Sequence, residues 1–78
     1  MREKKDTLIV TFAETAQAMA AEKFCMENGL PGRIIPVPRA ITAGCGLAWK
    51  AAPQDETALT AAFIMAGLEW DTMVVLKI

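Results

Sequence analysis

The segment that most constrains the fold of this chain is 33–38, an apolar run in which Pro36 and Pro38 stand two positions apart. Proline has no backbone N–H group, so it cannot donate to a neighbouring strand and is confined to the edges of sheets. Because backbone groups alternate in direction along a strand, both missing donors face the same side. The segment is therefore predicted to be an edge strand that pairs with one neighbour only.

The periodicity of the apolar residues predicts the other elements. Strands are expected where β-branched and aromatic residues are concentrated, at 7–12, 46–50 and 72–78. Helices are expected at about 15–28 and about 53–66, each followed by a glycine that can adopt a left-handed conformation. The strand at 46–50 returns from the edge strand through a turn over 40–45.

Capping residues and core-facing stripes can be predicted for both helices. Thr11 and Glu14 resemble a capping box, Thr15 is a second candidate cap for the first helix, and Asp55 is expected to cap the second. The stripes expected to face the core are Ala16, Met19, Ala20 and Phe24 in the first helix and Leu59, Ala62, Phe63 and Ala66 in the second. The methionines expected to fill gaps in the core are Met19, Met26, Met65 and Met73.

The order β-α-β-β-α-β over residues 1–78 is typical of a single α+β domain with a ferredoxin-like sandwich fold. In that fold a four-stranded antiparallel sheet carries both helices on one face, and the second strand lies at an edge. The two prolines place the second strand there independently. A less regular α+β arrangement is also compatible with the same order of elements.

Composition excludes several classes of function. The net charge of −1 lacks the basic excess on which nucleic-acid binding depends, and no apolar run is long enough to cross a membrane. The chain has no histidine and no Cys-x-x-Cys motif, so neither a metal nor another cofactor is expected. The absence of a signal peptide and the presence of only two cysteines favour the cytoplasm, with both thiols reduced.

Cys45, between Gly44 and Gly46, is the residue with the most distinctive chemistry. The expected topology places this turn near the start of the first helix, at 12–15, where the helix N-terminus favours an anion such as a thiolate. Arg39 could add a positive charge, and the flanking glycines leave the sulfur open to another molecule. A free cysteine is equally often a small buried apolar residue, so a structural role stays open. Cys25, inside the first helix, is expected to be structural.

A resemblance to a known family bears on whether Cys45 is reactive or structural. Segment 35–39, the Gly44-Cys45-Gly46 turn and Gly29 are similar to the signature of a small bacterial family described as selenium/sulfur carrier proteins. The resemblance implies that Cys45 carries sulfur or selenium as a persulfide or selenopersulfide. It also implies two kinds of partner, a donor such as a cysteine desulfurase and an acceptor protein. That family tends to have Ser or Thr where the first helix begins, whereas this chain has Ala13, Glu14 and Thr15.

Three functions remain after these exclusions. The first is a carrier rather than an enzyme, with Cys45 as the carrying residue and Thr15, Arg39, Gly44 and Gly46 around it. The second is a non-catalytic ligand-binding or dimerisation module in which Cys45 is structural. The third, a thiol redox enzyme or sensor, lacks a partner cysteine unless a second copy supplies one. Apolar residues on both faces of the strands predict a homodimer through the sheet face that the helices leave open.

Overall fold

The computed structural model describes residues 4–39, 41 and 44–78. Its elements, in chain order, are β1 (Asp6–Thr11), α1 (Thr15–Glu27), β2 (Arg33–Pro36), β3 (Leu47–Ala51), the short 3₁₀ helix η1 (Pro53–Asp55), α2 (Glu56–Ala66) and β4 (Thr72–Lys77). The predicted order of strands and helices is confirmed, and most boundaries agree to within two residues. No helix in the described ranges has the length and apolar character that a membrane span requires.

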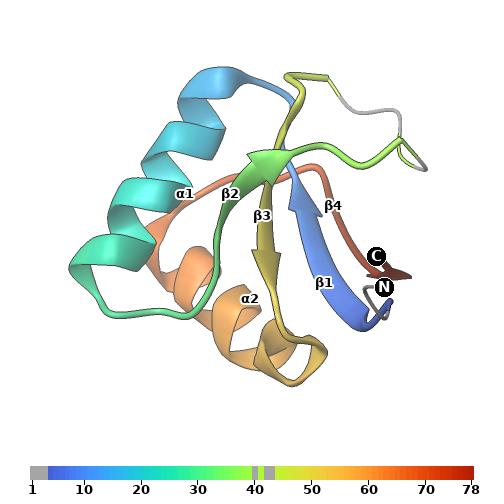
Figure 1. Cartoon of the computed structure of the whole chain (residues 1–78). Coiled ribbons are helices and arrows are strands. Elements are labelled where there is room, and N and C mark those ends of the chain that lie inside the picture. The colour runs from blue at the N-terminus through green and yellow to red at the C-terminus, as the bar shows by residue number, and fades with distance from the viewer. Residues whose placement is uncertain (1–3, 40, 42–43) are drawn as a thin grey trace.

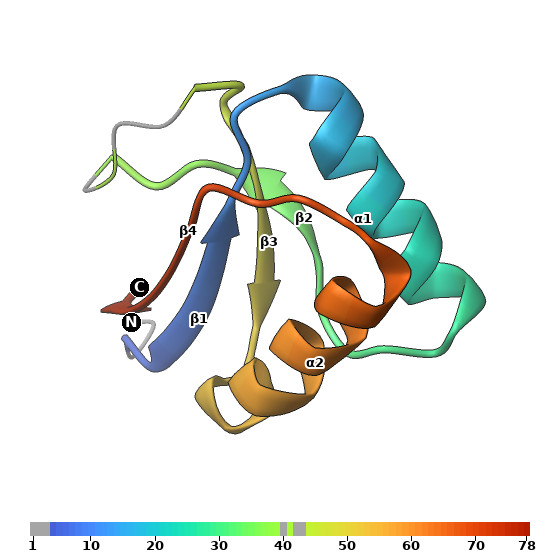
Figure 2. The ribbon, with the colours of Figure 1, turned by 180° about the vertical axis from the view of Figure 1, so that it is seen from behind.

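The strands form one antiparallel sheet in the order β2-β3-β1-β4. Both helices lie on the same side of this sheet, as Figures 1 and 2 show from opposite directions. The two ends of the described chain lie side by side, because Lys5 and Ile78 exchange backbone hydrogen bonds of 3.2 and 3.1 Å. This arrangement is the predicted ferredoxin-like α+β sandwich.

The edge position of β2 is confirmed. In the sheet β2 pairs only with β3, and Pro36 lies opposite Leu47. The N–H group of Val37 donates to the carbonyl oxygen of Gly46 at 2.9 Å, so the residues on either side of Val37 direct their nitrogens away from β3. These residues are Pro36 and Pro38, whose missing donors therefore cost the sheet no hydrogen bond.

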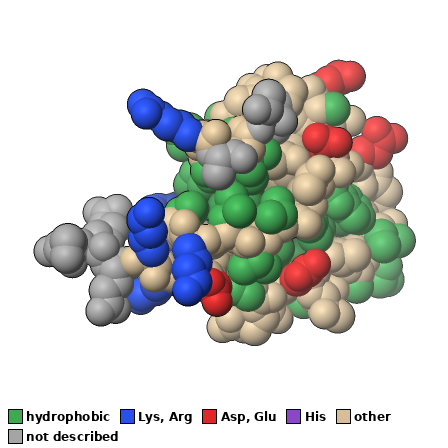
Figure 3. All heavy atoms as spheres, turned by 90° about the vertical axis from the view of Figure 1, so that its right-hand side faces the viewer, with side chains coloured by type: hydrophobic (Ala, Val, Ile, Leu, Met, Phe, Trp, Pro, Cys, Tyr) green, Lys and Arg blue, Asp and Glu red, His purple; other side chains and the backbone are tan. Residues whose placement is uncertain are grey.

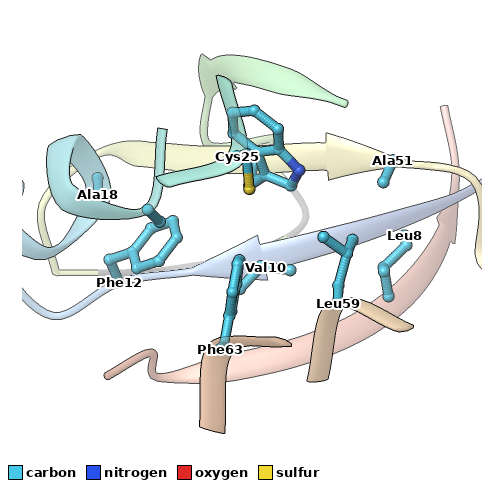
Figure 4. Packing of buried hydrophobic residues seen from close by; sticks show 10 residues of the cluster. Leu8, Val10, Phe12, Ala18, Cys25, Ala51, Leu59 and Phe63 are labelled. Carbon is cyan, nitrogen blue, oxygen red and sulfur yellow. The ribbon is translucent and has the colours of Figure 1, made fainter. Parts of the chain in front are cut away.

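The core lies between the sheet and the helices and is built from large and small side chains in complementary positions. The sheet and the residue that follows β1 contribute bulk, above all Trp49 and Phe12, and α2 contributes Leu59 and Phe63 (Figure 4). The residues that α1 buries are all small: Ala18, Ala21 and Cys25. Small side chains allow α1 to lie close to the sheet, where the large strand residues fill the remaining volume.

The predicted core face of α1 is wrong. Met19 is 60% exposed, Ala16 and Ala20 are exposed, and of the predicted stripe only Phe24 packs against the core, in part. Alanines lie on all sides of this helix, so its sequence does not define a single apolar face. Of the methionines predicted to fill gaps in the core, Met73 packs against it, and the prediction is wrong for the other three, which are exposed: Met19, Met26 and Met65. In α2 the prediction holds for Leu59 and Phe63, but Ala66 is exposed.

The caps of the helices also differ from the prediction. Glu14 is the N-cap of α1, Thr15 is its first helical residue, and Gln17 completes the capping box, so the predicted pairing of Thr11 with Glu14 is wrong. The segment before α2 forms η1, and Asp55 makes no side-chain capping bond. The glycine stop is confirmed at Gly67, which has a φ of 71°.

The sheet face that the helices leave open is apolar as well. Ile9 alternates with core residues of β1, so its side chain lies on this opposite face. It is nevertheless 0% exposed. The half-exposed apolar residues of this face lie around it: Ile35, Val37, Val74 and Leu76. Figure 3 shows the molecule from this side, with hydrophobic side chains gathered near its centre.

Candidate functional site

The Gly44-Cys45-Gly46 turn is fixed to the chain just beyond the end of β1. The backbone N–H group of Cys45 donates to the carbonyl oxygen of Phe12 at 3.4 Å. Gly44 lies so close to the same segment that a Cβ atom there would sit 2.7 Å from the carbonyl oxygen of Ala13. A side chain at position 44 would force the two segments apart, so the close approach requires glycine. The predicted proximity of Cys45 to the segment before α1 is confirmed.

Gly46 has a different reason to be glycine. Its φ of 79° is in the left-handed region that other residues rarely adopt, although a Cβ atom would meet no other atom within 4 Å. Its carbonyl oxygen accepts the 2.9 Å hydrogen bond from Val37, which joins the turn to the chain beyond β2. Cys45 is therefore held from both sides by backbone contacts, directly before β3.

The side chain of Cys45 lies at the boundary between the core and solvent. It is half-buried and packs against the hydrophobic core cluster, while Gly44 and Gly46 on either side are exposed. Its thiol donates a hydrogen bond to the carbonyl oxygen of Leu47, with 3.6 Å between sulfur and oxygen. The sulfur is thus less open than the sequence predicts, although the flanking Gly44 and Gly46 have no side chains that could shield it.

The start of α1 is less available to an anion than the sequence predicts. The backbone N–H groups of Ala13 and Glu14 both donate to Oε1 of Gln17, at 3.2 and 3.3 Å. Gln17 therefore occupies donors that a thiolate or another anion would otherwise use. Gln17 is not among the predicted site residues, although the spacing of Glu14 and Gln17 is that of a capping box.

The other predicted site residues lie around the turn with fewer contacts. Thr15 is exposed at the first position of α1. Arg39 is also exposed, and the chain turns after it through a 3.0 Å hydrogen bond from the N–H group of Ile41 to the carbonyl oxygen of Pro38. Residues 40, 42 and 43 of the predicted turn lie outside the described residues. The participation of Thr15 and Arg39 in a site stays a prediction.

Cys25 is in a wholly different environment from Cys45. Its side chain is fully buried in the core, on the face of α1 that lies against the sheet (Figure 4). Burial raises the pKa of the Cys25 thiol to about 11. Neutral and inaccessible, Cys25 is a packing residue, as predicted. Within the described part of the chain, no three His, Cys, Asp or Glu side chains are grouped so as to hold a metal ion.

Comparison with known proteins identifies the family. The family model described as "Putative Se/S carrier protein-like" matches residues 7–75, which span all the strands and helices except the ends of β1 and β4. No curated protein and no solved structure gave a significant match to the chain. Because the family model covers nearly the whole fold and includes the Cys45 turn, the chain belongs to the Se/S carrier protein-like family.

Proposed function

We propose that this protein carries sulfur or selenium on Cys45 and passes it from a donor protein to an acceptor. The observation that supports the proposal is the contrast between the two thiols. Cys45 lies half-buried between two exposed glycines, whereas Cys25 is enclosed in the core with a raised pKa. A carrier of this kind needs one accessible thiol and no second cysteine nearby that would release the bound atom as a disulfide forms.

The transfer needs no oxidant. The Cys45 thiolate attacks the terminal sulfur of a persulfide on the donor, such as a cysteine desulfurase, and forms a new S–S bond. The donor's own S–S bond breaks, and its cysteine leaves as a thiolate. Cys45 then holds the persulfide until an acceptor nucleophile attacks its terminal sulfur and Cys45 leaves as a thiolate. The same steps apply to selenium, and they suit the cytoplasm, where thiols are kept reduced.

The residues around Cys45 can each be assigned a role in the proposed transfer. Exposed Gly44 and Gly46 let the donor's cysteine approach from either side along the chain. The hydrogen bond from the Cys45 thiol to the Leu47 carbonyl oxygen must break before attack, because a thiolate has no proton to donate. Arg39 and Thr15 would contact the partner rather than the sulfur, since both side chains are exposed.

The loading reaction can be tested with purified components. We expect a cysteine desulfurase supplied with cysteine to transfer one sulfur atom to the parent protein and to the Cys25→Ala variant. The Cys45→Ser variant should accept none. If Cys25→Ala accepted no sulfur and Cys45→Ser were fully loaded, Cys25 and not Cys45 would be the carrying residue. Equal loading of both variants would favour the alternative function, a binding or dimerisation module with a structural Cys45.

The protein is also proposed to act as a homodimer that pairs through the open sheet face. Ile35, Val37, Val74 and Leu76 are half-exposed on this face and surround the buried Ile9. A second copy would cover these side chains and enlarge a small core. A competing apolar surface exists on the outer sides of the helices, where Met65 is 88% exposed.

One pair of variants separates the two surfaces. Leu76→Glu places a charge on the open sheet face, and Met65→Glu places the same charge on α2. Light scattering at tens of micromolar, roughly where a specific dimer persists, should show a dimer for the parent and for Met65→Glu but a monomer for Leu76→Glu. A monomeric parent, or dissociation caused by Met65→Glu alone, would contradict pairing through the sheet.

A further inference from the structure

A cleft lies at the other end of the sheet, away from Cys45. This cleft has a volume of about 650 Å³, and its lining includes three basic residues from separate parts of the chain: Lys5, Arg33 and Lys50. It lies at the end of β3, whereas Cys45 precedes the start of β3. The length of that strand separates the two regions by roughly 15 Å. The cleft is therefore independent of the proposed carrier residue.

Two of these basic residues stand in an arrangement that is unfavourable by itself. Arg33 and Lys50 are directly opposite each other in the pairing of β2 with β3. Both alternate with residues that contact the core, Ile34 and Trp49, so both side chains lie on the open sheet face. Like charges directly opposite on one face destabilise a sheet, and such departures from favourable pairing are typical of functional sites.

The backbone holds this pair together. Gly32, directly before Arg33, has a φ of 117°, and a Cβ atom there would collide with the carbonyl oxygen of Lys50 and the indole of Trp49. The indole N–H group of Trp49 donates to the carbonyl oxygen of Pro31 at 3.0 Å. These contacts hold the start of β2 against the end of β3, so the backbone positions of Arg33 and Lys50 stay adjacent in the structure.

Two acidic residues also line the cleft, Asp6 and Asp55, and each lies near a positive group outside the set of three basic residues. Asp6 lies opposite Lys77 in the pairing of β1 with β4. Asp55 precedes α2, whose N-terminal end is the positive end of the helix dipole. The three basic side chains still outnumber the two carboxylates, so the lining keeps a positive excess that an anionic ligand can neutralise. Figure 3 shows Lys and Arg side chains gathered at one end of this face, beside the hydrophobic ones.

We propose that this cleft binds a small organic polyanion that carries phosphate or carboxylate groups. The guanidinium of Arg33 can bind such a group through two parallel hydrogen bonds, and Lys50 and Lys5 add point charges. The volume is in the range of about 300–1,000 Å³ that is usual for small-molecule sites. Ala51, Ala52 and Ile78 provide apolar contacts for the rest of the ligand.

The proposal can be tested by amide NMR titration of the whole chain with pyrophosphate and, separately, with citrate at constant ionic strength. Saturable shifts are expected at the amides of Lys5, Gly32, Arg33 and Lys50. A lower dissociation constant for pyrophosphate would assign a phosphate ligand, and a lower one for citrate a carboxylate ligand. Arg33→Gln and Lys50→Gln should each weaken binding about tenfold, as expected for the loss of a charge-assisted hydrogen bond.

Control variants distinguish a specific anion-binding site in the cleft from nonspecific electrostatic attraction of anions to the protein. Arg39→Gln removes an exposed charge far from the cleft and should change the affinity less than twofold. Cys45→Ser should bind both anions as the parent does, even if the carrier function fails. Arg33→Lys keeps the charge and should retain more affinity than Arg33→Gln, and dispersed amide spectra will show that each variant is folded. Shifts that do not saturate, or equal weakening by Arg39→Gln and Arg33→Gln, would overturn the proposal.

Discussion

Gly44 and Ala13 meet more closely than any other residue at position 44 would allow, since a Cβ atom there would lie 2.7 Å from the Ala13 carbonyl oxygen. This contact joins the Cys45 turn to the segment that leads into α1. It also makes the position of the sulfur depend on a residue that has no side chain of its own. The consequences can be measured through substitutions at the two glycines of the turn.

Gly44→Ala should displace the turn, weaken the hydrogen bond between Cys45 and Phe12, and lower the free energy of unfolding by about 1–3 kcal/mol, the usual range for overpacking. Gly46→Asn is the matched control, because Asn tolerates a positive φ and no atom lies within 4 Å of the new Cβ. It should cost less than about 1 kcal/mol. Urea denaturation of both variants would measure the difference. Equal losses would show that the Ala13 contact imposes no constraint.

The small residues that α1 buries lead to a second prediction. Ala21→Leu should lower the free energy of unfolding by about 1–3 kcal/mol, because α1 would have to move away from the sheet to admit the larger side chain. Met19→Ala should change it by less than about 0.5 kcal/mol, since Met19 is 60% exposed. Thermal or urea denaturation measures both. A larger loss of unfolding free energy for Met19→Ala than for Ala21→Leu would indicate that the face of α1 predicted from periodicity is the buried one.

These two positions also show how far the sequence could predict the structure. Pro36 and Pro38 fixed the edge strand because a missing donor excludes every other place in the sheet. Alanine carries no such restriction, so the many alanines of α1 do not determine which face of the helix lies against the sheet, where Trp49 and Phe12 fill the core. Apolar periodicity could not distinguish the exposed Ala16 and Ala20 from the buried Ala18 and Ala21, because all four are the same residue type.

The candidate site was predictable in its position and less so in its details. The topology alone brought Cys45 to the segment before α1, because the end of β1 and the start of β3 lie at the same end of an antiparallel sheet. The contact of its thiol with the Leu47 carbonyl oxygen depends on the rotamer, which no sequence pattern encodes. The basic cleft was missed because Lys5, Arg33 and Lys50 are far apart in the chain and meet only through strand pairing.

The two thiols should differ in reactivity toward an alkylating agent. Cys45 is half-buried and reachable, whereas Cys25 is fully buried with a pKa of about 11, so iodoacetamide at neutral pH should modify Cys45 alone. Peptide mass spectrometry over a time course would identify the modified residue. In urea, where both thiols are exposed, the rates should converge. Preferential modification of Cys25 in the folded protein would contradict the described burial.

The raised pKa of Cys25 also predicts a loss of stability in alkaline solution. The folded protein keeps the Cys25 proton between pH 9.0 and about 11, where the unfolded chain has released it. The free energy of unfolding therefore decreases as pH rises through this range, by at most about 3 kcal/mol from this group. Cys25→Ala removes the group, so its stability should depend less on pH than that of the parent. Parallel urea midpoints for the two proteins from about pH 8 to pH 10.5 would show that the burial of Cys25 has no such effect.

The most direct test of the carrier function is the intact mass of the protein purified from cells without reductant. We predict a population heavier by one sulfur or one selenium atom, which a thiol reductant converts to the unmodified mass. The added atom should be absent from Cys45→Ser and present in Cys25→Ala, because only Cys45 lies within reach of a partner. An added atom that survives in Cys45→Ser, or its absence from the parent when a donor is present in the same cells, would contradict the assignment of Cys45 as the carrying residue.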